Sequence, residues 1–502
     1  MSVDTNNAAF QDALNLIQYT RQSVFLTGKA GTGKSTFLRY VCENTKKKHV
    51  VLAPTGIAAI NAGGSTMHSF FKLPFYPLLP DDPNLSLQRG RIHEFFKYTK
   101  PHRKLLEQIE LVIIDEISMV RADIIDAIDR ILRVYSHNLR EPFGGKQLLL
   151  VGDVFQLEPV VKNDEREILN RFYPTPYFFS ARVFGQIDLV SIELQKVYRQ
   201  TDPVFVGVLD HIRNNTAGAA DLQLLNTRYG SQIEESEADM YITLATRRDT
   251  VDSINEKKLA ELPGDPITFE GVIEGDFPES SLPTSQELVL KPGAQIIFIK
   301  NDFDRRWVNG TIGVIAGIDE EEETIYVITD DGKECDVKRE SWRNIRYRYN
   351  EKTKEIEEEV LGSFTQYPIR LAWAITVHKS QGLTFSRVVI DFTGGVFAGG
   401  QAYVALSRCT SLDGIQLKKP INRADVFVRP EIVNFAGRFN DRQAIDKALK
   451  QAQADVQYAA ASRAFDKGDM EECLEQFFRA IHSRYDIEKP VPRRFILSLI
   501  HI

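Results

Sequence analysis

The chain of 502 residues is predicted to be an α/β protein built on parallel sheets, and three observations carry that prediction. The run Gly-Lys-Ala-Gly-Thr-Gly-Lys-Ser-Thr at 28–36 stands between an apolar stretch and a helical pattern, as a phosphate-binding loop does. Further apolar runs at 49–53, 111–114 and 147–151 each end in a polar loop, as buried parallel strands do. The same alternation returns between residues 370 and 408, so a second α/β domain is expected.

Bulk composition excludes several classes of protein. Hydrophobic residues make up 43% of the chain and charged residues 26%, the proportions of an ordinary soluble protein. No run approaches the roughly 20 apolar residues that span a bilayer, and the first residues lack the basic and apolar regions of a signal peptide. We therefore expect no membrane partner, no targeting signal and a cytoplasmic location.

The cysteines and the charge balance limit the kinds of site that are expected. Cys42, Cys335, Cys409 and Cys473 lie far apart, so neither a metal knuckle nor a disulfide framework is indicated. The net charge of −7 argues mildly against a nonspecific coat on nucleic acid. It leaves room for a localised basic channel, because acidic runs such as 319–323 can dominate the total.

In the phosphate loop, glycines let backbone N–H groups face phosphate oxygens, and the following helix adds partial positive charge. Lys34 is expected to reach the β- and γ-phosphates, and the Ser35 hydroxyl to hold Mg²⁺. The expected nucleotide-binding residues here are Gly28, Ala30, Gly31, Thr32, Gly33, Lys34, Ser35 and Thr36.

Two flanking stretches offer residues to the base and the phosphates of a nucleotide. A helix is expected at 8–17, and its Phe10 and Gln11 could approach the adenine, although a helix that only caps the sheet explains the pattern equally well. Much later, Tyr198 could stack on the base and Arg199 could reach the phosphates.

Two further strands end in residues suited to hydrolysis. The strand at 111–114 ends in a pair of carboxylates: in a phosphate-loop ATPase, Asp115 would hold Mg²⁺ and Glu116 would polarise the attacking water as general base. The strand at 147–151 leads to Gln156, which can sense the γ-phosphate or serve only as a loop amide.

The loop after the strand at 49–53 combines hydroxyl groups, a histidine and paired aromatic residues. Such side chains can bind phosphates and stack on bases, although serine and threonine turns and core phenylalanines are the commoner explanation. The candidates in this loop are Pro54, Thr55, Gly64, Thr66, His68 and Phe70.

Two insertions and a helical tail complete the chain. Residues 72–104 are rich in proline and aromatic residues and break the α/β rhythm, so they are interpreted as an insertion in the first domain. Residues 288–367 are predicted to form a small antiparallel barrel or sandwich, with hairpin signals at Asn309-Gly310 and Asp331-Gly332. Its strands are expected at 294–300, 310–318 and 324–329. From 441 the chain is expected to be helical, and one tetratricopeptide-type unit there favours packing against the core over a solenoid.

Seven motifs stand in order in this chain. They are Gly-Lys-Ala-Gly-Thr-Gly-Lys-Ser, Ala-Pro-Thr-Gly, Ile-Asp-Glu-Ile-Ser-Met, Gly-Asp-Val-Phe-Gln-Leu-Glu-Pro, Val-Tyr-Arg-Gln, Thr-Val-His-Lys-Ser-Gln-Gly and Tyr-Val-Ala-Leu-Ser-Arg. Over Phe10 to Arg408 the chain resembles the Pif-type (petite integration frequency) DNA helicases of superfamily one B, which are related to RecD-like enzymes. Met119 and the run Trp307 to Gly310 also resemble this group. Without long extensions around the core, the chain looks like a compact bacterial or phage member, nucleoid-associated.

The resemblance implies two RecA-like domains with ATP in the cleft between them. The expected division is 1–180 for the first domain, with a wedge-type insertion at about 65–105, and 181–285 plus 366–435 for the second. An SH3-like β-barrel is expected at 286–365 and a helical region at 436–502.

The resemblance also assigns roles to matched residues. Lys34, Glu116 and Gln156 would act from the first domain, while Arg199 and Arg408 would cross the cleft from the second, or serve only as interface salt bridges. Gln381 and Gly382 would contact the nucleotide. Thr376, His378 and Lys379 would join the residues of the first domain along single-stranded DNA.

The resulting expectation is an ATP-dependent helicase that translocates 5′ to 3′ on single-stranded DNA, uses ATP and Mg²⁺ and unwinds tailed or forked duplexes. Polarity comes from the resemblance alone, and the preferred structure among forks, G-quadruplexes and R-loops stays open. The alternatives are an ATP-gated DNA-binding switch and the motor subunit of a recombination complex. A phosphate-loop kinase is disfavoured because it needs neither two distal arginine motifs nor a second α/β domain.

Overall fold

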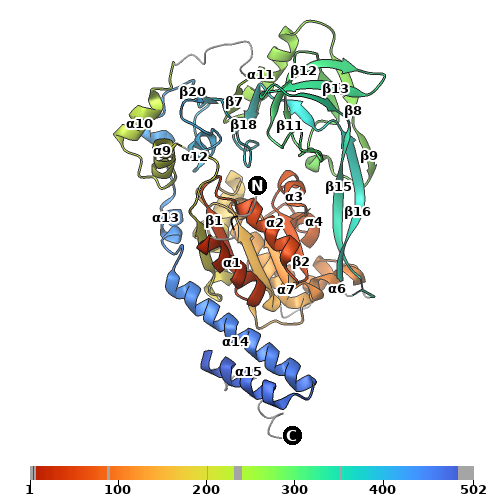
Figure 1. Ribbon diagram of the computed structural model, residues 1–502, viewed down its shortest axis with the longest axis vertical. Coiled ribbons are helices and arrows are strands. Elements are labelled where there is room, and N and C mark those ends of the chain that lie inside the picture. The colour runs from red at the N-terminus through yellow and green to blue at the C-terminus, as the bar shows by residue number, and fades with distance from the viewer. Residues whose placement is uncertain are drawn as a thin grey trace.

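The structure is a computed structural model that describes residues 4, 7–86, 91–200, 202–230, 240–350, 352–353 and 355–483. Figure 1 shows a red-to-orange α/β body, a second α/β unit and a group of antiparallel strands above it, and two helices below it. Within the described ranges, no helix is long and apolar enough to cross a lipid bilayer. The expected α/β class with two parallel sheets is confirmed.

The first domain is built on a parallel sheet of six strands in the order β3-β2-β4-β5-β1-β6. Its strands are β1 (Val24–Gly28), β2 (His49–Ala53), β3 (Ser65–Thr66), β4 (Leu111–Ile114), β5 (Gln147–Val151) and β6 (Val190–Leu194). Its helices are α1 (Ala8–Tyr19), α2 (Lys34–Asn44), α3 (Gly56–Ala62), α4 (Met67–Phe71), α5 (Arg91–Phe95), α6 (Lys100–Gln108), α7 (Ala122–Tyr135) and α8 (Asn163–Leu169). All strands expected in this region are confirmed.

Both faces of this sheet are buried, which explains the continuous apolar runs. In β4, Leu111 and Ile113 pack in the core that α1 and α2 share, whereas Val112 and Ile114 pack in the core that α7 shares. Successive side chains of a strand point to opposite faces, so a strand covered on both sides needs apolar residues throughout. The polar residues that follow each strand therefore gather at one edge of the sheet.

The predicted domain boundary after residue 180 is wrong. Strand β6 pairs in parallel with β1, Val24 opposite Val190, and so belongs to the first domain. The pairing of β6 with β1 assigns β6 to the first domain, and a pairing between strands so far apart in the chain is not visible in the local sequence.

The second domain has a parallel sheet of four strands in the order β18-β7-β19-β20. Its strands are β7 (Ile242–Ala245), β18 (Ala374–Thr376), β19 (Val388–Asp391) and β20 (Ile415–Leu417). Its helices are α9 (Pro203–Arg213), α10 (Ala219–Asn226), α11 (Arg248–Glu261) and α12 (Gln401–Leu406). Helix α13 (Pro430–Ala436) was predicted to belong to this domain, but Ile432 and Phe435 pack in the core of the first domain, where Phe435 contacts Phe25.

An antiparallel β region separates β7 and α11 from β18. Its strands are β8 (Ile267–Glu270), β9 (Val272–Gly275), β10 (Glu287–Leu290), β11 (Gln295–Phe298), β12 (Ile312–Asp319), β13 (Thr324–Thr329), β14 (Glu334–Val337), β15 (Glu340–Asn350), β16 (Glu355–Gln366) and β17 (Ile369–Leu371). The three predicted strands are confirmed, but the region begins before the predicted residue 286, because β8 pairs with β10 and β9 with β16. Asp331-Gly332 joins β13 to β14 as predicted, whereas Asn309-Gly310 lies in a long connection and forms no tight hairpin.

A long hairpin of β15 and β16 links the antiparallel region to the first domain, and the sequence analysis missed it (Figure 1). Tyr347 and Tyr349 on β15 are buried in the core of the first domain, and the Tyr347 hydroxyl accepts a hydrogen bond from the Val51 N–H at 3.4 Å. Ile345 packs on the same core, and this spacing of two is the signal that could have predicted the strand.

The C-terminal helices α14 (Arg442–Asp466) and α15 (Met470–Ser483) form an antiparallel pair below the first domain (Figure 1). Ile445 and Ala448 at the start of α14 pack into the core beside α1, so the predicted helical packing is confirmed for this part. The far end of α14 and α15 pack on each other through a small core that includes Ala461, Cys473 and Phe477. The tail beyond 483 lies outside the described residues.

Candidate functional site

A cavity of about 490 Å³ lies where the phosphate loop faces the second domain. Most of the predicted nucleotide-binding and catalytic residues line it together. These are Phe10, Ala30, Gly31, Thr32, Gly33, Lys34, Ser35, Thr36, Glu116, Gln156, Tyr198, Arg199, Gly382 and Arg408. Gly28, Gln11, Asp115 and Gln381 do not line it.

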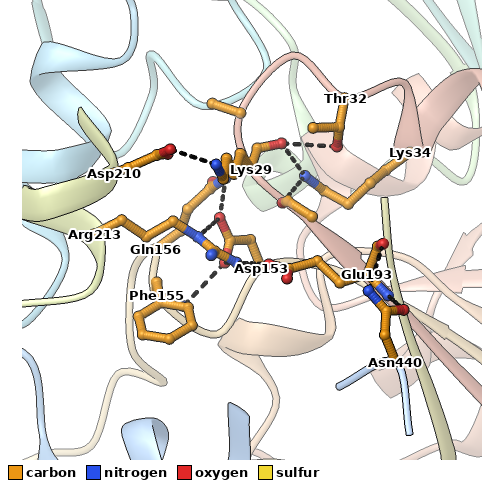
Figure 2. Close-up of polar contacts among 12 residues, drawn as sticks. Lys29, Thr32, Lys34, Asp153, Phe155, Gln156, Glu193, Asp210, Arg213 and Asn440 are labelled. Atoms are coloured by element: carbon orange, nitrogen blue, oxygen red, sulfur yellow. Dashed lines mark hydrogen bonds and ion pairs between the residues drawn. The ribbon is translucent and has the colours of Figure 1, made fainter. Parts of the chain in front are cut away.

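The phosphate loop runs from β1 into α2 in the predicted manner. Gly33 precedes the helix in the left-handed region at φ 89°, a conformation that favours glycine. The Lys34 ammonium lies back along the loop and donates hydrogen bonds to the carbonyl oxygens of Gly28 at 2.7 Å and Lys29 at 3.0 Å (Figure 2). Burial lowers the pKa of Lys34, which the carboxylates of Asp153 and Glu116 partly offset. Among the described residues, the ammonium therefore stands at the cavity without a carboxylate bound to it.

Glu116 follows β4 and lines the cavity from the first domain. Its backbone is in the left-handed region at φ 49°, which is uncommon for a residue with a side chain. Burial, reinforced by the neighbouring Asp115, raises the pKa of Glu116 to about 7, while Lys34 and Arg408 act in the opposite direction. A carboxylate in such a place suits a general base.

Ser35 and Asp115 are the residues that fit a divalent cation. Ser35 lies in the first turn of α2 on the cavity wall, and Asp115 stands at the end of β4, where burial raises the pKa of its carboxyl group. Over the described residues, no group of three or more histidine, cysteine or acidic side chains forms a metal cage. One hydroxyl and one carboxylate suit Mg²⁺, which usually keeps several waters and takes its other ligands from substrate phosphates.

Two arginines reach the cavity, and backbone carbonyls hold both of them. Arg408 is 1% exposed and donates to the carbonyl oxygens of Ser380 at 3.2 Å and Leu383 at 3.3 Å. Arg199 donates to the carbonyl oxygens of Ser407 and Gly382, both at 3.4 Å. Within the described part of the chain, neither guanidinium pairs with a carboxylate, so the alternative of an interface salt bridge is not supported. Burial lowers the pKa of both groups, that of Arg408 to about 9.

Arg199 lies on the segment after β6, between the domains, and not on the body of the second domain as predicted. A side chain at Gly31 would place its Cβ 2.4 Å from the Cβ of Arg199, so this segment and the phosphate loop are in direct contact. The Tyr198 N–H donates to the Gly31 carbonyl oxygen at 2.9 Å. Any shift of the segment therefore moves Arg199 relative to the phosphate loop.

The other end of the cavity has an aromatic wall. Phe10 is 6% exposed and packs edge-on against Phe37 and Tyr40, so it serves the core as well as the cavity. Tyr198 is 40% exposed, and its hydroxyl donates to Asp4 at 2.9 Å. Asp4, Asn7, Leu194 and Thr384 line the cavity and were missed by the sequence analysis, because no motif marks them.

Tyr403 was named only as part of a motif, yet it bridges the two domains. It lies on α12 of the second domain, and its hydroxyl accepts a hydrogen bond from the Ala30 N–H at 3.0 Å. The amide nitrogen of Gln381 is buried and has no hydrogen-bond partner among the residues that the structure describes.

The predicted DNA-side residues form two similar arrangements, one on each domain. Each has a Thr-x-His sequence directly at the end of an edge strand, β3 in the first sheet and β18 in the second. The Thr66 hydroxyl accepts from the Ser69 N–H and the Thr376 hydroxyl from the Lys379 N–H, both at 3.2 Å. Ligands of open parallel sheets bind at the carboxyl ends of the strands, which is where both loops lie.

An exposed aromatic ring covers the histidine of each loop. His68 stacks on Phe75 with ring centroids 5.1 Å apart, and His378 lies parallel to Phe397 at 6.4 Å. Phe75 is 84% exposed and Phe397 60% exposed. Neither residue is predicted from the sequence, because exposure is not visible in the local pattern.

The prediction that Phe70 stacks on bases is wrong. Its side chain is 3% exposed and packs edge-on against Phe71 and Tyr347 in the core of the first domain. Gly64 also has a packing role, since a Cβ there would lie 2.2 Å from the Val51 carbonyl oxygen.

The remaining predicted positions lie near the same edge. Thr55 is exposed, and its hydroxyl caps α3 by accepting from the Ala58 N–H, with Pro54 before it. Lys379 is an exposed residue, but partial desolvation of its ammonium, together with the charges of Arg370 and Arg248, lowers the pKa of that ammonium. Three cationic side chains thus gather beside the loop of the second domain.

Comparisons with known proteins agree with this arrangement. Residues 4–211 match the family described as PIF1-like helicase. The chain is 33% identical to the ATP-dependent DNA helicase Pif1 of Campylobacter jejuni, over 79% of this chain and 88% of that protein.

A crystal structure of Bacteroides sp. Pif1 with ADP-AlF4 is similar, with a TM-score of 0.79 and 41% identity over 87% of this chain and 97% of that one. The same helicase bound to single-stranded DNA gives a TM-score of 0.63 with 41% identity, over 88% of this chain and 99% of that one. The structure is therefore more similar to the ADP-AlF4 complex than to the complex with single-stranded DNA.

Proposed function

The chain belongs to the PIF1-like helicases, and we propose that it is an ATP-dependent DNA helicase that moves 5′ to 3′ on single-stranded DNA and unwinds tailed or forked duplexes. One observation carries the proposal. The cavity between the domains gathers Lys34, Glu116 and Gln156 of the first domain with Arg199 and Arg408. A site divided between two domains makes hydrolysis dependent on their relative position.

In the proposed reaction, Glu116 accepts the proton of the attacking water while Lys34 and the loop amides hold the transferred phosphoryl group. Arg199 and Arg408 stabilise the charge that develops on that group. Both guanidiniums are available for this role, since carbonyl oxygens hold them in place without neutralising them. When bound at Ser35 and Asp115, Mg²⁺ supplies further charge neutralisation on phosphate oxygens.

A single short segment connects the nucleotide to the proposed DNA track in the second domain. Thr376, His378 and Lys379 stand at its start, and Gly382 lines the cavity at its end. The Arg408 guanidinium donates to the Ser380 carbonyl oxygen within the same segment. A displacement caused by the nucleotide is thereby passed to the DNA-side loop over a few residues.

Strand separation against 5′-tailed and 3′-tailed duplexes tests the proposal. We expect the purified chain to unwind the 5′-tailed substrate with ATP and to leave the 3′-tailed substrate intact. Glu116→Gln serves as the matched inactive control. DNA-stimulated hydrolysis without strand separation would instead support an ATP-gated binding switch, and separation only with an added partner would support a motor subunit.

A further inference from the structure

Helix α9 of the second domain faces the first domain with two charged residues one turn apart, Asp210 and Arg213 (Figure 2). Asp210 pairs with Lys29 of the phosphate loop, and Arg213 pairs with Asp153 and Glu193. We propose that Arg213 is a positioning residue that ties the orientation of Gln156 to the closure of the second domain. The inference rests on the proposed function and on one of the two roles that the sequence allows for Gln156, the sensing of the γ-phosphate.

The contacts of Arg213 are directional and buried. Its Nη2 lies 3.1 Å from Oδ1 of Asp153 and 2.9 Å from Oε1 of Glu193, and its Nε lies 3.4 Å from Oδ2 of Asp153. The guanidinium also lies over the ring of Phe155 at 4.3 Å. Arg213 is 3% exposed and Asp153 1% exposed, so a planar fork is held in one orientation away from water.

Asp153 passes this orientation to Gln156. Its Oδ1 accepts the Phe155 N–H at 3.2 Å, and its Oδ2 accepts the Gln156 side-chain amide at 3.4 Å (Figure 2). Each carboxylate oxygen therefore serves Arg213 on one side and the sensor loop on the other. Loss of the guanidinium would free the carboxylate to turn, and the amide of Gln156 with it.

A second element of the second domain holds the same loop from another direction. Gly400 precedes α12 at φ 79°, and a Cβ there would lie 2.2 Å from the Gln156 carbonyl oxygen and 2.4 Å from that of Phe155. The loop at 153–156 is thus fixed between α9 and the start of α12. Relative motion of the two domains must change at least one of these contacts.

This arrangement differs from a simple interface ion pair in what it predicts. An ion pair that only joins the domains would weaken every nucleotide complex alike when broken. A positioning residue would lower turnover, and would weaken the preference for a nucleotide with a γ-phosphate, because Gln156 is one of the residues that contact that group.

The test uses Arg213→Gln, Gln156→Ala and the double variant in the full chain. Steady-state DNA-stimulated ATP hydrolysis gives kcat and KM, and equilibrium binding gives the affinities for ADP and for a non-hydrolysable ATP analogue. We expect Arg213→Gln to lower kcat about 10²-fold, the scale of a misplaced catalytic group, while ADP affinity changes little. The double variant should be no slower than Gln156→Ala alone, because both changes remove the same interaction.

Arg133→Gln is the matched control. Arg133 is also a buried arginine, 6% exposed, and pairs with Asp129 at 2.8 Å within α7, away from the cavity. It should lower the melting temperature without lowering kcat. If Arg213→Gln fails to fold, Arg213→Lys takes its place in the same set of single and double variants. Lysine keeps the positive charge but lacks the planar guanidinium that binds both carboxylate oxygens.

If the fold losses in kcat of the two single variants multiply in the double variant, the inference is overturned and Arg213 keeps only an interface role. The same conclusion follows if Arg213→Gln lowers the affinities for ADP and for the analogue equally. If the wild-type chain hydrolyses ATP and Arg213→Gln does so with the same kcat, the inference is overturned and the proposed function still holds. If the wild-type chain neither hydrolyses ATP nor unwinds DNA, both the inference about Arg213 and the proposed function are overturned.

Discussion

The hydroxyl of Tyr403 accepts a hydrogen bond from the backbone N–H of Ala30, so a helix of the second domain touches the phosphate loop of the first. Tyr403→Phe removes the acceptor and leaves a buried N–H without a partner, which costs about 1–3 kcal/mol. We expect KM for ATP to rise about tenfold, the effect of roughly 1.4 kcal/mol. Steady-state kinetics with saturating DNA measures it, and an unchanged KM would contradict a role for this bond in holding the loop.

Glu116→Gln tests the assignment of the general base. The amide keeps the shape of the side chain but cannot accept a proton, so we expect ATP and DNA binding to persist while turnover nearly stops. Lys34→Ala, in contrast, should lose both binding and turnover, because the proposed role of this ammonium is to hold the phosphates of bound ATP as well as those of the transition state. Hydrolysis at the wild-type rate by Glu116→Gln with DNA present would refute the assignment.

The two arginines are expected to act on the transition state more than on bound nucleotide. Arg199→Ala should lower DNA-stimulated turnover by roughly 10³–10⁵, the range for arginine fingers, with a much smaller loss of nucleotide affinity. Arg408 is fully buried, so Arg408→Lys is the better variant, because an alanine would leave a larger cavity. Lysine lacks the planar guanidinium that contacts two carbonyl oxygens, so turnover should still fall. Retained turnover in either variant would demote that arginine to a structural role.

Lys379 tests the proposed track on the second domain. Each neutralised phosphate of a single strand contributes about −0.7 to the slope of log affinity against log salt. We expect Lys379→Ala to weaken binding to any single-stranded sequence and to make that slope shallower by about this amount. Lys467→Ala, an exposed lysine after α14, is the control and should leave the slope unchanged. An unchanged slope for Lys379→Ala would place that lysine off the track.

The sequence predicts those parts of the fold whose signals are local. The strands 49–53 and 147–151 match the predicted bounds, because short apolar runs between polar residues fix where a doubly covered strand begins and ends. The motifs, in their order along the chain, likewise predict the phosphate loop and most of the residues that line the cavity.

Features that depend on distant partners could not be predicted. Phe70 was interpreted as a base-stacking residue, yet Tyr347 from a hairpin of the antiparallel region covers it. Strand β6 was assigned to the wrong domain, since only its pairing with β1 places it. Phe75 stands a few residues from Phe70 and shows the opposite exposure, which no periodicity in that proline-rich stretch indicates.

This contrast gives the last prediction. Phe75 and Phe397 present exposed rings beside His68 and His378, so Phe75→Ala and Phe397→Ala should each weaken single-strand binding by about 1–3 kcal/mol, the range for one base stacked on one aromatic ring. Their melting temperatures should barely change, because little apolar area is lost from the core. Phe70→Ala should do the reverse and cost about 3–5 kcal/mol of stability through the cavity it leaves. Fluorescence anisotropy with a labelled single strand and thermal denaturation separate the two effects, and equal DNA affinity of Phe75→Ala and wild type would remove Phe75 from the track.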